Sequence, residues 1–238
     1  MEQKILGVIG GMGPKATAVF FDTIIERTAA SRDQDHINMV ILNHATIPDR
    51  TQVIAQGQAD QFLTTIARDF ALLEQAGAAN IAIPCNTSHY FYEHMQAMTS
   101  VPIINMIDET WKVVFERFGA GCRAAVLATT GTISTKVYAK GIAQYPMQLV
   151  EPPANLQQEV MDIIYTDVKA NNNCDPERLQ RLIDQMIEQY ECDCVILACT
   201  ELSCIALDSV YKNCTVDAMQ TLVDRAIILS GKQVNQQL

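Results

Sequence analysis

Short apolar runs alternate along the chain with longer stretches in which apolar residues recur every three or four positions. The runs are four or five residues long and rich in Val, Ile and Leu, as expected of buried strands. They are Ile5–Ile9, Met39–Leu42, Ala79–Ile83, Val101–Ile104, Ala124–Ala128, Met147–Val150 and Val195–Ala198. The amphipathic stretches between them have helical length and include Ala16–Ala30, Gln58–Gln75, Glu109–Phe118, Asn155–Lys169 and Glu177–Tyr190. This order predicts an α/β fold with parallel sheets.

Two of the expected helices carry recognisable start signals. Asn155 precedes LQQEV and predicts a side-chain cap on the first turn. Asp175 is followed by Pro176, which predicts a capping carboxylate with proline at the first helical position.

The chain contains an internal repeat of two motifs. IAIPCNTSHYF ends a strand at Cys85, and VILACTELSCI ends another at Cys199, 114 residues later. At a similar offset, ILGVIGGMGPKAT and AAVLATTGTISTK each read as a strand, a turn of small residues and a helix start. The repeat predicts two α/β halves related by a pseudo-twofold, with equivalent strand ends facing a cleft between them.

Charge and composition restrict the partners. The 238 residues are 49% hydrophobic and 18% charged, and 17 Lys and Arg against 27 Asp and Glu give a net charge of −10. This field and the absence of any basic cluster disfavour nucleic acid or an anionic membrane as partner. No apolar run approaches the length of a membrane span, and the N-terminal MEQKILGVIGG lacks the features of a signal peptide, so we expect a cytoplasmic protein.

The eight cysteines read as reduced thiols in such a protein. Cys192 and Cys194 are spaced CxC, without the second close pair that a structural zinc site requires. We therefore expect no metal site and treat most of the thiols as small core residues.

Cys85 and Cys199 stand apart from the other thiols because both follow a strand. Ligands of open α/β sheets gather at such strand ends. Asn86, Thr87 and Thr200 are expected to cap helix starts directly after the thiols, and a helix N-terminus lowers the pKa of a nearby thiol. Two thiols facing each other would let one remove a proton from a carbon while the other donates one. Taken singly, each fits an ordinary buried cysteine better; their paired position in the repeat favours chemistry.

Four ordered motifs carry a resemblance to a known family. GVIGGMGPKAT, IPDRT (Ile47–Thr51), IPCNTSH and LACTEL together resemble the aspartate/glutamate racemase family, in particular its aspartate racemase branch. The resemblance covers essentially the whole chain. It implies two Rossmann-like domains, here 1–104 plus 216–238 and 105–215, a homodimer, and a reaction without pyridoxal phosphate or any other cofactor. It also implies that Cys85 and Cys199 are the catalytic pair.

The same resemblance assigns the other site residues. Arg50, in IPDRT, and Lys169, in YTDVKAN, correspond to cations that hold the carboxylates of a dicarboxylic amino acid. His89, four residues after Cys85, and His44 are weaker candidates whose roles stay open. The remaining residues expected around the substrate are Met12, Asn86, Thr87, Thr130, Thr200 and Glu201.

Parts of the sequence also fit other functions. Gly11 to Ala16 fits the GxGxxA pattern of a nucleotide-binding oxidoreductase, but the second strand ends at Asn43 and His44 without the acidic residue that binds the ribose. A non-catalytic protein that closes on a dicarboxylate would need the two cations but not both cysteines. Within the superfamily, glutamate racemase, hydantoin racemase, broad amino-acid specificity and single-cysteine decarboxylation or isomerisation are alternatives.

Overall fold

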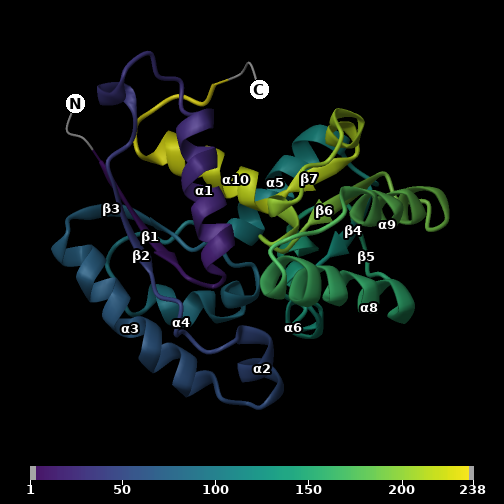
Figure 1. Ribbon diagram of the computed structural model, residues 1–238, viewed down its shortest axis with the longest axis horizontal. Helices are drawn as coiled ribbons and strands as arrows, with labels where there is room; N and C mark the ends of the chain where they lie inside the picture. The colour runs from purple at the N-terminus through teal and green to yellow at the C-terminus, as the bar shows by residue number, and fades with distance from the viewer. Residues whose placement is uncertain (1–3, 236–238) are drawn as a thin grey trace.

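The computed structural model describes residues 4–235 and contains two parallel sheets. The first has the strand order β2-β1-β3 and the second the order β5-β4-β6-β7, and every pair of neighbouring strands is parallel. Their bounds are Ile5–Gly10 (β1), Met39–Asn43 (β2), Ala78–Ala82 (β3), Arg123–Leu127 (β4), Gln148–Val150 (β5), Cys194–Leu197 (β6) and Thr215–Asp217 (β7). The two sheets lie in separate halves of the molecule (Figure 1), so the α/β prediction is confirmed.

Helices connect the strands and cover the sheets. The α-helices are Pro14–Arg27 (α1), Arg50–Ala55 (α2), Ala59–Gln75 (α3), Tyr92–Gln96 (α4), Met106–Phe118 (α5), Thr130–Ser134 (α6), Val137–Gly141 (α7), Ala154–Asp162 (α8), Pro176–Glu188 (α9) and Ala218–Leu229 (α10). Shorter or differently wound segments are Asp33–Asp35 (η1), Thr87–Phe91 (η2), Ile142–Gln144 (η3), Ile163–Ala170 (η4), Leu202–Cys204 (η5) and Ser209–Asn213 (η6). None of the helices within residues 4–235 is both long and apolar enough to cross a membrane.

Three local predictions need correction. The run Val101–Ile104 does not form a strand and makes only an isolated parallel bridge, between Ile103 and Ile81. Asn155 does not cap α8, because the helix begins at Ala154 directly after Pro153 and takes Asn155 into its first turn. The expected helix Asn155–Lys169 changes its winding at Ile163, where the π-helix η4 begins.

Asp175 behaves as predicted. Its side chain accepts a hydrogen bond from the backbone N–H of Glu177 at 3.1 Å, and Pro176 is the first residue of α9.

The C-terminal helix α10 packs beside α1 on the first sheet, although the second sheet precedes it in the chain. Leu222 and Val223 share a core with Leu6 and Val8 of β1 and Phe20 of α1. α10 also contacts α5, which follows the first sheet along the chain (Figure 1). We keep the division into 1–104 plus 216–238 and 105–215 as a proposal for the domain boundaries.

Two glycines allow close approaches that shape the region between the sheets. Gly11, after β1, has a φ of +88°, and a Cβ there would lie 2.4 Å from the backbone carbon of His44. A Cβ on Gly131 of α6 would lie 2.8 Å from Thr51 Oγ1 of α2. The first contact brings the loops after β1 and β2 together, and the second lets α6 of one half approach α2 of the other.

Candidate active site

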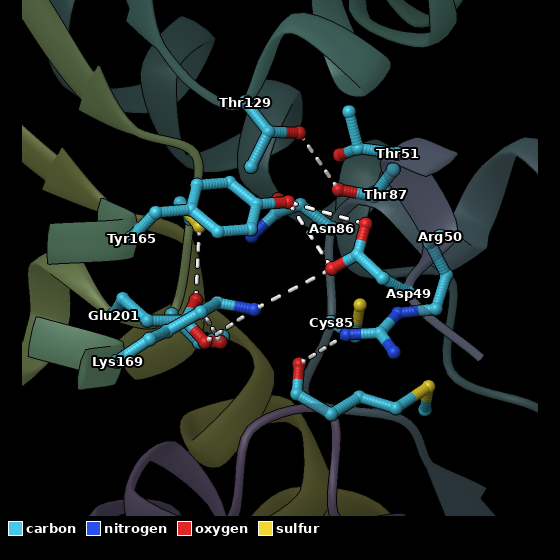
Figure 2. A pocket seen from close by; sticks show the side chains of 13 residues that line it. Asp49, Arg50, Thr51, Cys85, Asn86, Thr87, Thr129, Tyr165, Lys169 and Glu201 are labelled. Atoms are coloured by element: carbon cyan, nitrogen blue, oxygen red, sulfur yellow. Dashed lines mark hydrogen bonds and ion pairs between the residues drawn. The ribbon is translucent and has the colours of Figure 1, made fainter. Parts of the chain in front are cut away.

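A small pocket lies where loops of the two halves meet. The first half contributes the loop after β1, the start of α2 and the loop after β3, and the second contributes the loops after β4 and β6 together with η4. Most of these segments follow the carboxyl ends of parallel strands, where ligands of such sheets bind. The lining residues are Met12, Asp49, Arg50, Thr51, Cys85, Asn86, Thr87, Thr129, Tyr165, Lys169, Cys199, Thr200 and Glu201 (Figure 2).

Cys85 and Cys199 both line this pocket, one from each half, and are 5% and 6% exposed. The expected lowering of the thiol pKa is wrong for Cys199. Burial raises the pKa of the Cys199 thiol well above its ordinary value, and the Glu201 carboxylate raises it further, while Lys169 acts in the opposite direction. The nearest helical segment, η5, is a single short turn without a side-chain cap, so it offers little dipole to offset burial.

The residues expected to cap helix starts after the two thiols make no capping hydrogen bond through their side chains. Asn86 occupies the position before η2 without a capping hydrogen bond, and Glu201 rather than Thr200 precedes η5. Thr200 Oγ1 instead donates to the carbonyl of Pro84 at 3.2 Å and so ties the loop after β6 to the loop after β3. The side-chain oxygen of Asn86 accepts from the Tyr138 hydroxyl at 2.6 Å.

Arg50 is 6% exposed and lies at the first position of α2. Its Nη1 donates to the carbonyl of Pro48 at 3.0 Å, and Nη2 donates to that of Met12 at 2.9 Å. Burial lowers the pKa of the guanidinium, but the neighbouring Cys85 thiol and the carboxylates of Asp49 and Glu201 outweigh burial and raise it overall. Its Nε is buried and has no hydrogen-bond partner among residues 4–235, so this donor is available to a ligand.

Lys169 lies on η4 between two carboxylates (Figure 2). Its Nζ is 3.4 Å from Glu201 Oε1, an ion pair without hydrogen-bond geometry, and 4.0 Å from Asp49 Oδ2. Burial lowers the pKa of the ammonium, but Glu201 and Cys199 outweigh it and raise that pKa overall. The cation predicted to hold a substrate carboxylate is therefore already balanced by the protein.

Tyr165 and Asp49 join the two halves at the pocket. The Tyr165 hydroxyl donates to Asp49 Oδ2 at 3.1 Å, and burial is the main reason why the pKa of Tyr165 rises to about 12. The ammonium of Lys169 lies 4.9 Å from the centre of the Tyr165 ring. Tyr165 and Lys169 are four residues apart in η4, a spacing that puts both side chains on one side of the helix.

Three buried threonines form a hydroxyl cluster between the halves. Thr87 Oγ1 lies 3.0 Å from Thr129 Oγ1 and 2.9 Å from Thr132 Oγ1. Thr130, which we expected in the site, is exposed and outside the pocket, and its backbone N–H points to Met161 Sδ. Thr129, the residue before α6, lines the pocket instead. The helix begins at Thr130 and turns the Thr130 side chain outward.

Neither weaker histidine candidate lines the pocket. His44 Nδ1 pairs with Asp69 of α3 at 2.8 Å. His89 is buried, with Nδ1 2.9 Å from the carbonyl of Cys85 and Nε2 3.4 Å from that of Ile104, and burial lowers its pKa. His89 thus holds the loop that carries Cys85.

Sequence reasoning missed Asp49, Thr51, Thr129 and Tyr165. Asp49 and Thr51 flank Arg50 inside IPDRT, so that motif contained the signal. Tyr165 stands four residues before Lys169, a spacing that places both side chains on one side of a helix, so the sequence contained this signal as well.

A family model covers most of the chain. The model of the Asp/Glu/Hydantoin racemase family matches residues 9–226. This chain belongs to that family. It is an amino-acid racemase, and the resemblance seen in its motifs is confirmed.

Relatives with both similar sequence and similar structure exist within the family. The chain is 30% identical over 205 residues to the broad-specificity amino-acid racemase RacX of Bacillus subtilis (strain 168), covering 84% of this chain and 87% of RacX. The aspartate racemase of Picrophilus torridus superposes with a TM-score of 0.84 at 29% identity, covering 98% of this chain and 97% of that one. An aspartate racemase homologue of Pyrococcus horikoshii OT3 shares the fold, with a TM-score of 0.78 at 24% identity and coverage of 96% and 99%.

Proposed function

We propose that this racemase interconverts L- and D-aspartate, with Cys85 and Cys199 as the two bases. The carrying observation is that both thiols line one pocket and come from opposite halves of the molecule. One sulfur, as thiolate, takes the proton from Cα, and the electron pair moves into the α-carboxylate. The other sulfur, as thiol, delivers its proton to the opposite face of the same carbon, which inverts its configuration.

The pocket supports recognition of an acidic amino acid through Arg50. A buried guanidinium keeps its charge throughout the reaction and can offer its free Nε–H to a carboxylate. Asn86 Nδ2 is a second buried donor with no partner among the described residues. The 29% identity to an aspartate racemase of nearly equal length favours aspartate as substrate.

A broad specificity is the second candidate. Lys169 is already paired with Asp49 and Glu201, which leaves a smaller positive field for a second substrate carboxylate than two free cations would give. The similarity to a broad-specificity racemase points the same way.

Incubation of single enantiomers of aspartate, glutamate and several neutral amino acids in D₂O tests the proposal. We expect loss of optical rotation together with deuterium at Cα, fastest for aspartate. Cys85→Ser and Cys199→Ser should abolish inversion, whereas Cys174→Ser, outside the pocket, should not. If the protein binds aspartate without exchanging the Cα proton, and the cysteine substitutions leave that binding unchanged, it is a binding protein. If it inverts neutral amino acids faster than aspartate, the second candidate is favoured.

We further propose that the enzyme works without pyridoxal phosphate or metal and as a cytoplasmic homodimer. The family resemblance of the sequence motifs supports these statements. Sedimentation equilibrium measures the oligomeric state directly, and a monomer at micromolar concentration would contradict the dimer.

A further inference from the structure

The two proposed bases are equally buried but have different charged neighbours. Cys199 Sγ lies 3.0 Å from Glu201 Oε2, within the same loop after β6. A carboxylate accepts hydrogen bonds and does not donate them, so this contact requires the proton to be on the sulfur. Glu201 is itself only 4% exposed, so water does not screen its charge from the thiol.

Cys85 has a cation beside it instead. The Arg50 guanidinium and the Cys85 thiol interact closely enough for the thiol to raise the pKa of Arg50, and the two side chains lie next to each other in the pocket (Figure 2). Within residues 4–235, the structure shows no carboxylate that accepts a hydrogen bond from Cys85. The hydrogen bond to Glu201 therefore distinguishes Cys199 from Cys85.

We propose that the resting enzyme carries its transferable proton on Cys199, with Glu201 as the positioning residue that keeps the proton there, so that Cys85 is the first base of the proposed pair. This inference rests on the proposed two-base function. It assigns the two thiols different roles in the enzyme that awaits substrate, which the symmetry of the repeat alone does not predict.

The proton balance then follows for one direction of the reaction. Cys85 removes the Cα proton, so an S–H bond forms on Cys85 as the C–H bond breaks. Cys199 then gives its proton to the opposite face of Cα and becomes a thiolate. This product form places a negative sulfur beside Glu201, and Lys169 is the cation that offsets the repulsion. The reverse reaction starts from this second form and restores the first.

The groups that face Cys199 come from several elements. Glu201 lies in its own loop, Lys169 reaches it from η4, and the buried Tyr138 hydroxyl of α7 interacts with it more weakly. Asp49, the N-cap residue of α2, and Arg50, the first residue of α2, both act on Lys169, and Arg50 also interacts with Glu201. Of these, Glu201 alone contacts the sulfur through a hydrogen bond, so it is the group to change first.

Alkylation of the full-length enzyme by iodoacetamide without substrate measures this proton distribution, because the thiolate is the reactive form. Peptide mapping at successive times gives a separate rate for each thiol across a pH series. We expect Cys85 to react faster than Cys199 near neutral pH, because the Glu201 carboxylate holds the proton on Cys199 and keeps that thiol in its less reactive form. The nearly identical exposure of the two thiols, 5% and 6%, argues against access as the cause of such a difference.

Three variants separate the charge of Glu201 from its shape. Glu201→Gln removes the charge and should speed the alkylation of Cys199 by about tenfold, with the pH midpoint of that rate shifted downward. Glu201→Asp keeps the charge and should stay close to the wild-type rate. Lys169→Met removes the opposing cation and should slow the alkylation of Cys199. Glu188→Gln, at the exposed end of α9, is the matched control and should change neither rate.

Equal alkylation rates of the two thiols in the wild type would overturn the proposal. So would an unchanged pH midpoint for Cys199 in Glu201→Gln. If Glu201→Gln does not fold, the slower reaction of Cys199 in Lys169→Met carries the test alone, and a faster reaction there contradicts it. Alkylation needs no turnover, so it tests the proton assignment separately from the proposed reaction. If Cys85 reacts faster than Cys199 but the protein does not invert aspartate, the proposed aspartate racemisation is wrong and the proton assignment stands.

Discussion

The Arg50 side chain holds two loops in place and is also the cation proposed to bind a substrate carboxylate. Its Nη atoms hold the carbonyls of Pro48 and Met12, while its buried Nε has no hydrogen-bond partner among residues 4–235. Arg50→Leu should therefore lose a charge-assisted contact worth about 1.5 to 3 kcal/mol, or about 10- to 150-fold in kcat/KM for aspartate. Arg50→Lys should recover only part of it, because an ammonium cannot make the same three contacts.

Arg68→Leu provides the control, since Arg68 is exposed on α3 away from the pocket. Initial rates of inversion, measured by circular dichroism over a range of aspartate concentrations, give kcat/KM for each variant. Equal values for Arg50→Leu and Arg68→Leu, with both proteins folded, would remove Arg50 from substrate recognition.

At this scale the sequence motifs predicted residues that line the pocket but not the environment of each side chain. Cys85, Cys199, Arg50 and Lys169 all line the pocket as expected. The raised pKa of the Cys199 thiol was not predictable, because it depends on the depth of burial and on the rotamer that places Glu201 Oε2 beside the sulfur. The position of α6 was not predictable either, and its start at Thr130 decides that Thr129 rather than Thr130 lines the pocket.

Asp49 caps α2 in the first half of the molecule and also contacts η4 in the second half. One carboxylate oxygen accepts from the backbone N–H of Gln52 at 3.0 Å, and the other accepts from the Tyr165 hydroxyl at 3.1 Å. Asp49→Ala should lower the free energy of unfolding by about 1 kcal/mol through the lost cap. Asp49→Asn keeps a capping oxygen and should stay within a few tenths of the wild type in urea unfolding.

Both substitutions also remove a negative charge that lies 4.0 Å from Lys169. Lys169 then has one competing carboxylate fewer, so the KM for aspartate should fall in Asp49→Asn while that for a neutral amino acid changes less. If Asp49→Ala is as stable as the wild type, Asp49 does not stabilise α2 as a cap. If the KM for aspartate is unchanged in Asp49→Asn, Asp49 does not compete with the substrate for Lys169.

Among the elements, hydrophobic periodicity predicted most of the central strands and longer helices to within a few residues. It failed where the backbone departs from regular geometry. Val101–Ile104 is as apolar as a strand, yet it pairs with β3 only through Ile103. The helix also changes its winding where α8 passes into the π-helix η4 at Ile163, and the apolar pattern does not show this change. The three-residue β7 is too short to stand out as an apolar run.

At the scale of the whole molecule, the repeat of two motifs predicted two sheets whose strand ends meet, and a pocket lies where their loops converge. A reaction carried by two thiols in this pocket needs no bound group. The purified enzyme should therefore show no pyridoxal absorbance and keep its full rate of aspartate inversion after exhaustive dialysis against a chelator. Activity that returns only on addition of pyridoxal phosphate or a divalent metal would contradict the two-thiol reaction.

The buried thiols also predict how the stability of the whole fold depends on pH. Burial is the first cause of a raised pKa at Cys199, at Cys204 to about 12 and at Cys174 to about 11. Below the ordinary thiol pKa of about 8.5, these groups are protonated in both the folded and the unfolded chain, and their contribution to stability is fully present. At higher pH the unfolded chain releases protons that the folded chain retains, so the free energy of unfolding should fall as pH rises toward the folded pKa values.

Urea unfolding in the presence of a reductant, at about pH 7.5 and about pH 10, measures this difference. Cys204→Ala removes one contributing thiol near the pocket and should make the decrease smaller, whereas Glu188→Gln should leave it unchanged. Cys122 works in the opposite direction, because a hydrogen bond with Cys194 lowers its pKa, but the raised pKa of Cys194 itself opposes that effect. A free energy of unfolding that stays constant or rises between the two pH values would show that the thiols are no more difficult to ionise in the folded chain than in the unfolded one.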